Sequence, residues 1–155
     1  MAAADSGNAL AVLRLPRLIA MLALAVAATT ATPAATPAAT TAIGAAEASA
    51  TRWLGLIDAG QYVAAWNAAA SYLHATVAEA QWISSVAQVR AAAGALQSRQ
   101  LKSAYQTSYL PGAPYGHYTV VYFVSRFAKR SAASETLTLM RDSAGGWRVV
   151  GYYLN

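Results

Sequence analysis

The chain has no cysteine among its 155 residues. This absence excludes disulfide bonds, thiol catalysis, thiolate metal sites and lipid attachment to an N-terminal cysteine. The two histidines, His74 and His117, stand far apart and form no H-x-x-x-H pattern, so we expect no metal site. There is also no Gly-x-Ser-x-Gly motif, phosphate-binding loop or dinucleotide fingerprint. The sequence therefore predicts no cofactor and assigns no residue a catalytic role.

Charge is scarce as well, since charged residues make up only 11% of the chain and the formal net charge is +5. No basic cluster exceeds the pair Lys129-Arg130, whereas nucleic-acid-binding domains gather Lys and Arg on one face, so we expect no nucleic-acid partner. Without Arg14, Arg17 and Asp5, nine basic and five acidic residues remain, a net charge of +4. Solubility alone explains this mild excess, which would also suit an acidic envelope surface.

The first 28 residues have the pattern of a secretory signal peptide. Arg14 and Arg17 form its positive region, and an apolar run at residues 18–26 is short for a bilayer span. Small residues at 25–28 provide two overlapping cleavage sites. We predict a periplasmic or secreted protein whose mature chain starts near Thr29 and has no membrane segment. The alternative is an uncleaved leader that anchors the domain to a membrane.

Residues 29–45 are almost entirely Ala, Thr and Pro. They have no aromatic residue and no apolar period, so they cannot bury enough surface to offset the entropy lost on ordering. Pro33 and Pro37 also oppose the helix that the alanines would otherwise favour. We predict a disordered linker here, followed by one folded domain over residues 46–155.

Three helices are predicted in the first half of that domain. Apolar residues recur at helical spacing over residues 47–59 and 62–73. Residues 76–79 form a capping box, Thr-Val-Ala-Glu, which opens a third helix that ends at Gly94. A tryptophan stands in the apolar stripe of each helix and is expected in the core: Trp53, Trp66 and Trp82.

Four strands are predicted after the helices, at residues 96–109, 118–124, 135–140 and 147–154. The first is polar and alternates weakly, which indicates an edge strand or one bent by a bulge; Arg99 and Tyr105 share one parity in it. The second and the last are apolar on both faces. Helices can cover one face of this sheet, whereas the other must curl on itself, meet a partner such as a second copy, or line a cavity.

The carboxylate of Glu135 stands in a predicted strand, where a role in a turn or a helix cap does not account for it. Alternation places it on the same face as Leu137 and Leu139, where a charge is costly unless it is paired. We predict that Glu135 is buried and hydrogen-bonded to an arginine, with Arg99 or Arg90 favoured over Arg126, because arginine can bind a carboxylate through two parallel hydrogen bonds. The alternatives are exposure at the rim of the sheet and a role as an acid in a pocket.

Several motifs, taken in order, resemble a known family. They include Trp53-Leu-Gly-Leu-Ile-Asp-Ala-Gly60, Gln81-Trp82, Val89-Arg90, Leu110-Pro-Gly-Ala-Pro114 and Gly146-Trp-Arg-Val-Val-Gly-Tyr152. At these spacings they resemble the bacterial envelope family called domain of unknown function 4019, over about residues 49–154. The resemblance implies a small exported domain and supplies no catalytic residues.

The predicted order, helices before strands, is the layout of NTF2-like and cystatin-like cone folds. We therefore expect an α+β domain in which three N-terminal helices pack on a curved four-stranded antiparallel sheet. Its expected role is non-catalytic binding of a small ligand or an envelope protein through the open side of the sheet. The alternative is a cone-fold isomerase or dehydratase, with Glu135 or Asp58 as base and Tyr122 or Tyr152 as donor. A closed cavity holding a carboxylate and a phenol would favour the enzyme.

Overall fold

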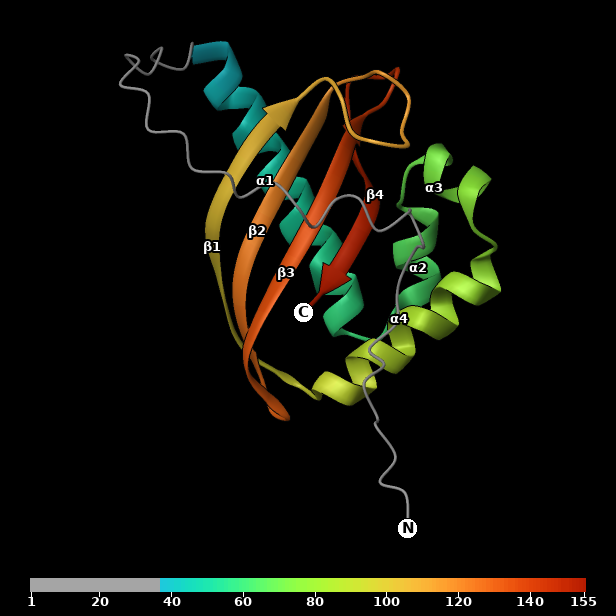
Figure 1. The fold of residues 1–155 in the computed structure, drawn as a ribbon, viewed down its shortest axis with the longest axis vertical. Coiled ribbons are helices and arrows are strands. Elements are labelled where there is room, and N and C mark those ends of the chain that lie inside the picture. Colours follow the sequence, from blue (N-terminus) through green and yellow to red (C-terminus); the bar gives the residue numbers. More distant parts are fainter. Residues whose placement is uncertain (1–36) are drawn as a thin grey trace.

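The computed structural model describes residues 37–155, and both the predicted signal peptide and residues 29–36 lie outside this part. The described chain is α+β (Figure 1). Its elements are α1 Pro37–Asp58, α2 Tyr62–Asn67, α3 Ser71–Thr76, α4 Glu79–Ala93, β1 Leu96–Thr107, β2 Tyr118–Phe127, β3 Arg130–Arg141 and β4 Trp147–Leu154. The strands form one antiparallel sheet in the order β1-β2-β3-β4. The α+β class and the four predicted strands are confirmed, and the described helices number four where three were predicted.

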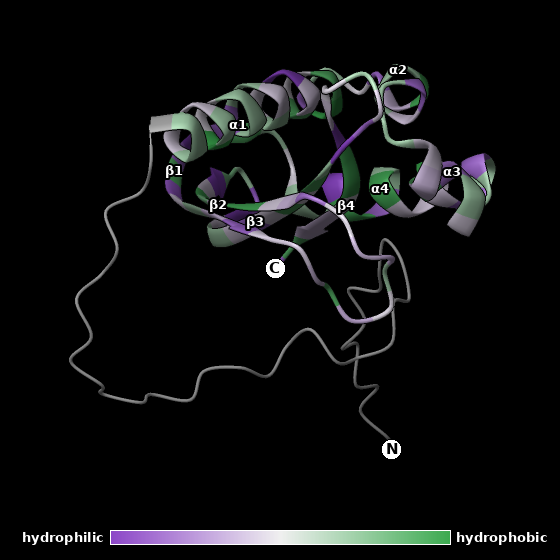
Figure 2. Cartoon of the chain, turned by 90° about the horizontal axis from the view of Figure 1, so that it is seen from above, coloured by the Kyte–Doolittle hydropathy of each residue, from purple (hydrophilic) through white to green (hydrophobic). Residues whose placement is uncertain are grey.

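The long helix α1 lies across one face of the sheet and packs against all four strands (Figure 2). We call this the inner face of the sheet, and the opposite one the outer face. The helices α2 and α3 lie beyond the β4 edge (Figure 1). Tryptophans from three helices and apolar residues of the inner face form the main core, which includes Trp53, Trp66, Trp82, Val121, Phe123, Phe127, Leu137, Leu139 and Tyr152.

The first helix begins earlier than predicted. The disordered linker is corrected over residues 37–45, which form the first turns of α1. Alanine is the strongest helix former, and a proline at the first helical position loses no hydrogen bond, so Pro37 does not prevent this start. Ala46 and Ala50 are buried, so the helix packs against the rest of the domain from these residues onward. Its first turns, at residues 37–45, extend in the N-terminal direction from this packed part.

Two further helix predictions need correction. The helix predicted over residues 62–73 is broken between α2 and α3, because the amide of Ala70 donates to the carbonyl of Val149 at 2.9 Å instead of continuing a helix. The capping box is also wrong, since the Thr76 hydroxyl donates back to carbonyls of α3. The end of α4 at Gly94 is confirmed, and its φ of 80° is one that glycine adopts without strain.

The first strand is an edge strand with a bulge, as its weak alternation predicted. The register shifts at Lys102, so residues on either side of it face opposite ways. Arg99 is paired with Ser125 on the inner face, whereas Tyr105 is paired with Val120 on the outer face. The prediction that Arg99 and Tyr105 share a face is therefore wrong, because an extra residue reverses the alternation.

A further irregularity lies in β4, where Val150 is the extra residue. Val149 and Tyr152 consequently pair with Leu139 and Leu137 and share the inner face. Strict alternation would place Val149 and Tyr152 on opposite faces. Register shifts also occur at Gln97 in β1 and near the β2–β3 turn, but those at Lys102 and Val150 decide which of these side chains face the core.

Thr119 gives a direct test of the packing on the inner face. Its side chain is fully buried, and its Oγ1 has no hydrogen-bond partner among the described residues. We predict that Thr119→Val raises the free energy of unfolding by about 1 kcal/mol. The substitution removes a buried hydroxyl that loses its hydrogen bonds to water on folding and gains none from the protein. Urea denaturation measures this, with Thr136→Val on the outer face as the matched control. A loss of stability in Thr119→Val alone would mean that the hydroxyl has a partner.

Candidate functional site

Glu135 lies fully buried on the inner face of β3. The Nε of Arg99 donates to its Oε2 at 2.6 Å, and the Nη2 of Arg99 donates to its Oε1 at 3.0 Å. The hydroxyl of Tyr152 donates to Oε1 at 2.7 Å, and the hydroxyl of Ser125 donates to Oε2. Arg90 adds a longer contact, 3.5 Å from Nη1 to Oε1. The carboxylate is thus surrounded by donors on both oxygens.

Asp58, the last residue of α1, completes this cluster. It accepts from the Nη2 of Arg90 at 2.7 Å and from the Nη1 and Nη2 of Arg99 at 2.6 and 2.9 Å. The guanidinium of Arg90 also lies over the ring of Phe127, 4.6 Å from its centre. Two carboxylates and two guanidinium groups balance in charge, and they join the end of α1 to α4, β1 and β3. We call Asp58, Arg90, Arg99, Ser125, Glu135 and Tyr152 the ion network.

The electrostatics of the ion network favour a structural role. Burial disfavours the charged form of Arg99, but hydrogen bonds and attraction from Asp58 and Glu135 outweigh it and raise the pKa. Burial raises the pKa of Tyr152, and the charge of Glu135 raises it further, so Tyr152 remains a neutral donor. Because every contact to Glu135 is a donated hydrogen bond, its oxygens are occupied by the protein itself.

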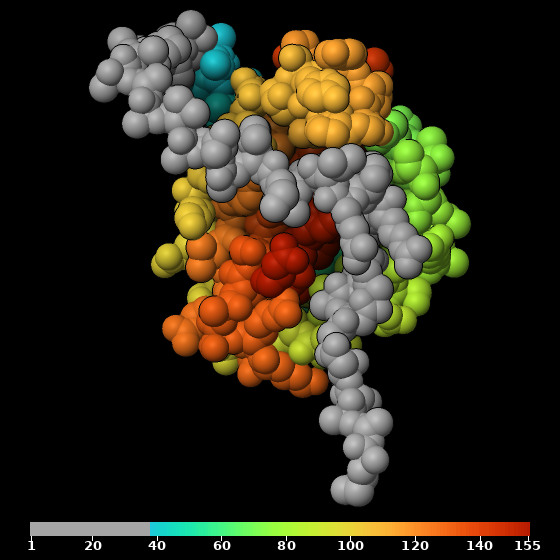
Figure 3. All heavy atoms as spheres, in the orientation of Figure 1, coloured from blue at the N-terminus to red at the C-terminus, as the bar shows by residue number. Residues whose placement is uncertain are grey.

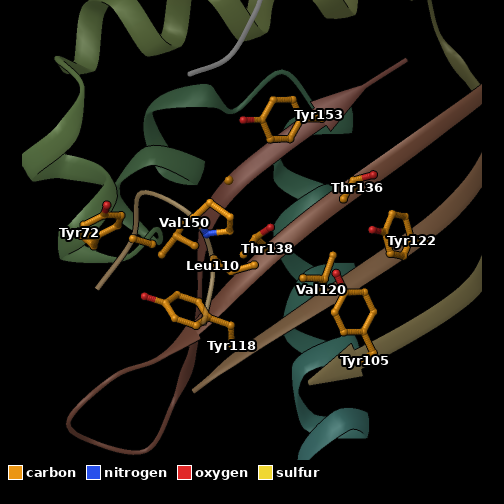
Figure 4. Close-up of a pocket in the computed structure, with 13 residues that line it drawn as sticks. Tyr72, Tyr105, Leu110, Tyr118, Val120, Tyr122, Thr136, Thr138, Val150 and Tyr153 are labelled. Atoms are coloured by element: carbon orange, nitrogen blue, oxygen red, sulfur yellow. The ribbon is translucent and has the colours of Figure 1, made fainter. Parts of the chain in front are cut away.

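A groove lies on the outer face of the sheet, away from the ion network (Figure 4). The space between its walls, counted out to open solvent, is about 620 Å³. None of its lining side chains carries a charge at neutral pH. They are Tyr72, Tyr105, Leu110, Pro111, Ala113, Tyr118, Val120, Tyr122, Thr136, Thr138, Val150, Gly151 and Tyr153.

The loop at residues 108–117 closes one end of the groove. Its turn places glycine at the position that needs a positive φ, and Gly112 has a φ of 79°. Two tyrosine hydroxyls then fix the loop, since Tyr72 donates to the carbonyl of Gly112 at 3.0 Å and Tyr118 donates to that of Pro114 at 2.6 Å. The end wall is therefore held by side chains from α3 and β2.

Tyr105 and Tyr122 stack beside the groove, with ring centres 6.2 Å apart and planes 24° from parallel. Burial raises the pKa of Tyr105, and a hydrogen bond with Tyr122 adds to the effect. Burial also raises the pKa of Tyr118 and of Tyr153. These phenols consequently stay neutral, and the groove presents rings, aliphatic groups and hydroxyls.

The structure brings together four of the five candidate residues chosen from the sequence, namely Glu135, Arg99, Arg90 and Tyr152. Tyr122 lies apart from them, in the groove. Sequence reasoning missed the part that Asp58 plays, although Asp58 stands four residues after the core residue Leu54 and so shares its helix face. No sequence signal pointed to Tyr72 or to the folded loop as walls of a groove.

Neither a metal centre nor a membrane span is found in the described residues. Over residues 37–155, no group of three or more His, Asp or Glu side chains could hold a metal ion. Over the same residues, no helix is long and apolar enough to cross a membrane.

The ion network predicts a large loss of stability when one partner is removed. Glu135→Gln and Arg99→Met should each lower the free energy of unfolding by roughly 3–5 kcal/mol, because each leaves a buried charge unmatched. Urea denaturation at neutral pH measures the change, with Arg126→Met on an exposed part of β2 as the matched control. If Glu135→Gln and Arg99→Met both unfold like the wild type, the pairing does not hold the fold together.

Comparison with known proteins agrees with the motifs read from the sequence. The model of one family, described as protein of unknown function (DUF4019), matches residues 49–152. This range includes every residue of the ion network and every lining residue of the groove except Tyr153. No curated protein and no solved structure matches the chain. The family match spans most of the chain and confirms the resemblance, so the chain belongs to the DUF4019 family.

Proposed function

We propose that this chain is an exported, non-catalytic domain that binds an uncharged, mainly apolar small molecule in the groove on its outer face. The observation that carries the proposal is the groove itself, a concave site with aromatic and aliphatic walls and a few hydroxyls. Ligand sites are typically concave and apolar, with a small number of polar groups that orient the ligand.

The lining chemistry supports an uncharged ligand. Among residues 37–155, no arginine, lysine, aspartate or glutamate lines the groove, so a charged ligand would lose its hydration without gaining a partner there. Tyrosine faces suit a flat or hydrocarbon ligand, because their rings offer large apolar contact areas that are already ordered. Val120 and Val150 contribute aliphatic surface between those rings (Figure 4).

The hydroxyls of the groove restrict the polar part of the ligand. The hydroxyls of Tyr72 and Tyr118 each donate a hydrogen bond to a backbone carbonyl of the loop. Toward a ligand, their oxygens can therefore act only as hydrogen-bond acceptors. Thr136 and Thr138 can rotate their hydroxyls to donate or accept. A ligand with one hydroxyl or amide N–H near the loop end and hydrocarbon elsewhere would match this distribution.

The enzyme alternative lacks a supporting observation. It needs a carboxylate and a phenol facing one cavity, but no carboxylate lines the groove. Glu135 lies on the opposite face, and Asp58 is engaged by two arginines. A second copy or an envelope protein, the other partners expected from the sequence, would have to cover the same outer face.

Export and the cone-fold relationship belong to this proposal. The leader pattern over residues 14–28 supports export, and cleavage near residue 28 would leave all of α1 in the mature protein, since α1 begins at Pro37. The order of one helical layer followed by an antiparallel sheet supports the NTF2-like or cystatin-like assignment.

A groove-filling substitution tests the binding site. A Cβ added at Gly151 would meet Thr138 and Tyr153 atoms no closer than 3.8 Å, so a valine fits the backbone while its methyl groups occupy the groove. We predict that the neutral fluorophore 1-N-phenylnaphthylamine brightens on binding the wild type, and that Gly151→Val weakens this binding by roughly tenfold or more. Fluorescence titration measures both affinities.

The matched control for that titration is Val63→Ser, a change at an exposed apolar residue of α2, which should bind like the wild type. Circular dichroism melts would verify that both variants fold. Equal affinity in wild type and Gly151→Val, or no binding to the wild type, would refute the proposed site.

The proposed export can be tested separately from ligand binding. We predict that the protein recovered from its native cell begins near Thr29, because signal peptidase requires the small residues at 25–28. N-terminal sequencing of the protein from the envelope and the medium reports the cleavage point. An intact Met1 in the membrane fraction would show an anchor instead.

A further inference from the structure

The loop at residues 108–117 carries a pair of exposed tyrosine rings. Tyr109 is 52% exposed and Tyr115 is 82% exposed. Their ring centres lie 5.5 Å apart, with 38° between the planes. Figure 3 shows this loop, coloured yellow to orange, standing out at the upper end of the molecule. Two large rings in contact with each other and open to solvent form a small aromatic surface outside the groove.

The loop is fixed rather than loose. At its start, the Thr107 hydroxyl accepts from the amide of Tyr109 at 3.2 Å. The amide of Gly116 donates to the carbonyl of Ser108 at 3.1 Å and closes the base of the loop. Together with the two tyrosine bonds to Gly112 and Pro114, these contacts mean that the exposed rings need little further ordering to meet a partner.

The surroundings of the loop suit an anionic lipid surface. Residues 108–117 include no acidic side chain. The amide of Arg141 donates to the carbonyl of His117, so the backbone of Arg141 lies next to the loop. Its side chain is exposed, and its Nε donates to the carbonyl of Gly145 in the β3–β4 hairpin at 3.4 Å. Arg148 lies on the same β3–β4 hairpin, where it pairs with Asp142. Tyrosine is enriched at the headgroup level of membranes, and nearby arginine is attracted by anionic lipids.

The path of the chain points to the same end of the molecule. The first turn of α1, where the described chain begins, lies at the end of the domain that carries this loop (Figure 1). The preceding 36 residues, with the apolar run at 18–26, therefore join the domain there. A leader that enters a membrane, even only during export, would bring this end of the domain to the bilayer.

We propose that the loop at residues 108–117 is a contact site for an anionic phospholipid surface, in which Tyr109 and Tyr115 enter the headgroup layer beside Arg141. The contact is independent of the ligand in the groove. It uses the outside of the loop, whereas the groove uses Leu110, Pro111 and Ala113 on the inside.

Hydrogen–deuterium exchange of the full chain tests this contact. The probe is vesicles of phosphatidylethanolamine and phosphatidylglycerol. Amides of the loop should exchange roughly tenfold more slowly with vesicles than without, whereas the turn at Ala128 and Lys129, at the opposite end of the sheet, should not change. The double variant Tyr109→Ser, Tyr115→Ser should lose the protection, because the leader alone does not hold the loop in the headgroup layer.

Two matched variants keep the test specific. Val63→Ser removes an equally exposed apolar residue elsewhere, and Gly151→Val fills the groove, so both should keep the protection of the loop. Loop exchange that is unchanged by vesicles would overturn the proposal. Protection that persists in the double tyrosine variant would overturn it as well.

Discussion

The burial of the Glu135 carboxylate is the constraint on which the rest of the structure depends. A lone charge at that position would cost several kcal/mol, so the fold has to deliver donors to both oxygens. Arg99 supplies two of them from β1, and Arg90 and Tyr152 supply others from α4 and β4. Asp58 then balances the second guanidinium from the end of α1. The ion network around this one carboxylate thereby joins α1 and α4 to the sheet.

The two faces of the sheet therefore carry different kinds of side chain. The inner face is filled by tryptophans, by aliphatic side chains and by an ion network whose hydrogen bonds are satisfied internally. The outer face keeps tyrosines and threonines around an open groove and carries no charge there. The ligand proposed for the groove would therefore meet neutral rings and hydroxyls, whereas the charged side chains of the ion network lie on the inner face.

The sequence predicted the structural features that depend on local residue patterns. Alternation along β3 predicted that Glu135 faces inward, and the neighbouring leucines predicted an arginine partner. The bulges at Lys102 and Val150 could not be predicted, because one extra residue turns the following side chains to the opposite face of the sheet without changing the composition of the strand. The break before α3 depends on a long-range bond from Ala70 to Val149, which no local propensity encodes. Strand positions were predictable, and the walls of the groove were not, because they come from separate elements.

The central claim is that Glu135 belongs to the scaffold and that binding belongs to the outer face. The most direct test is the affinity of Glu135→Gln for 1-N-phenylnaphthylamine, measured well below the unfolding temperature of the variant. The account predicts an affinity within about twofold of the wild type, because the carboxylate and the groove lie on opposite faces and act independently. A loss of roughly tenfold or more in folded protein would contradict it, since the carboxylate would then take part in the binding site.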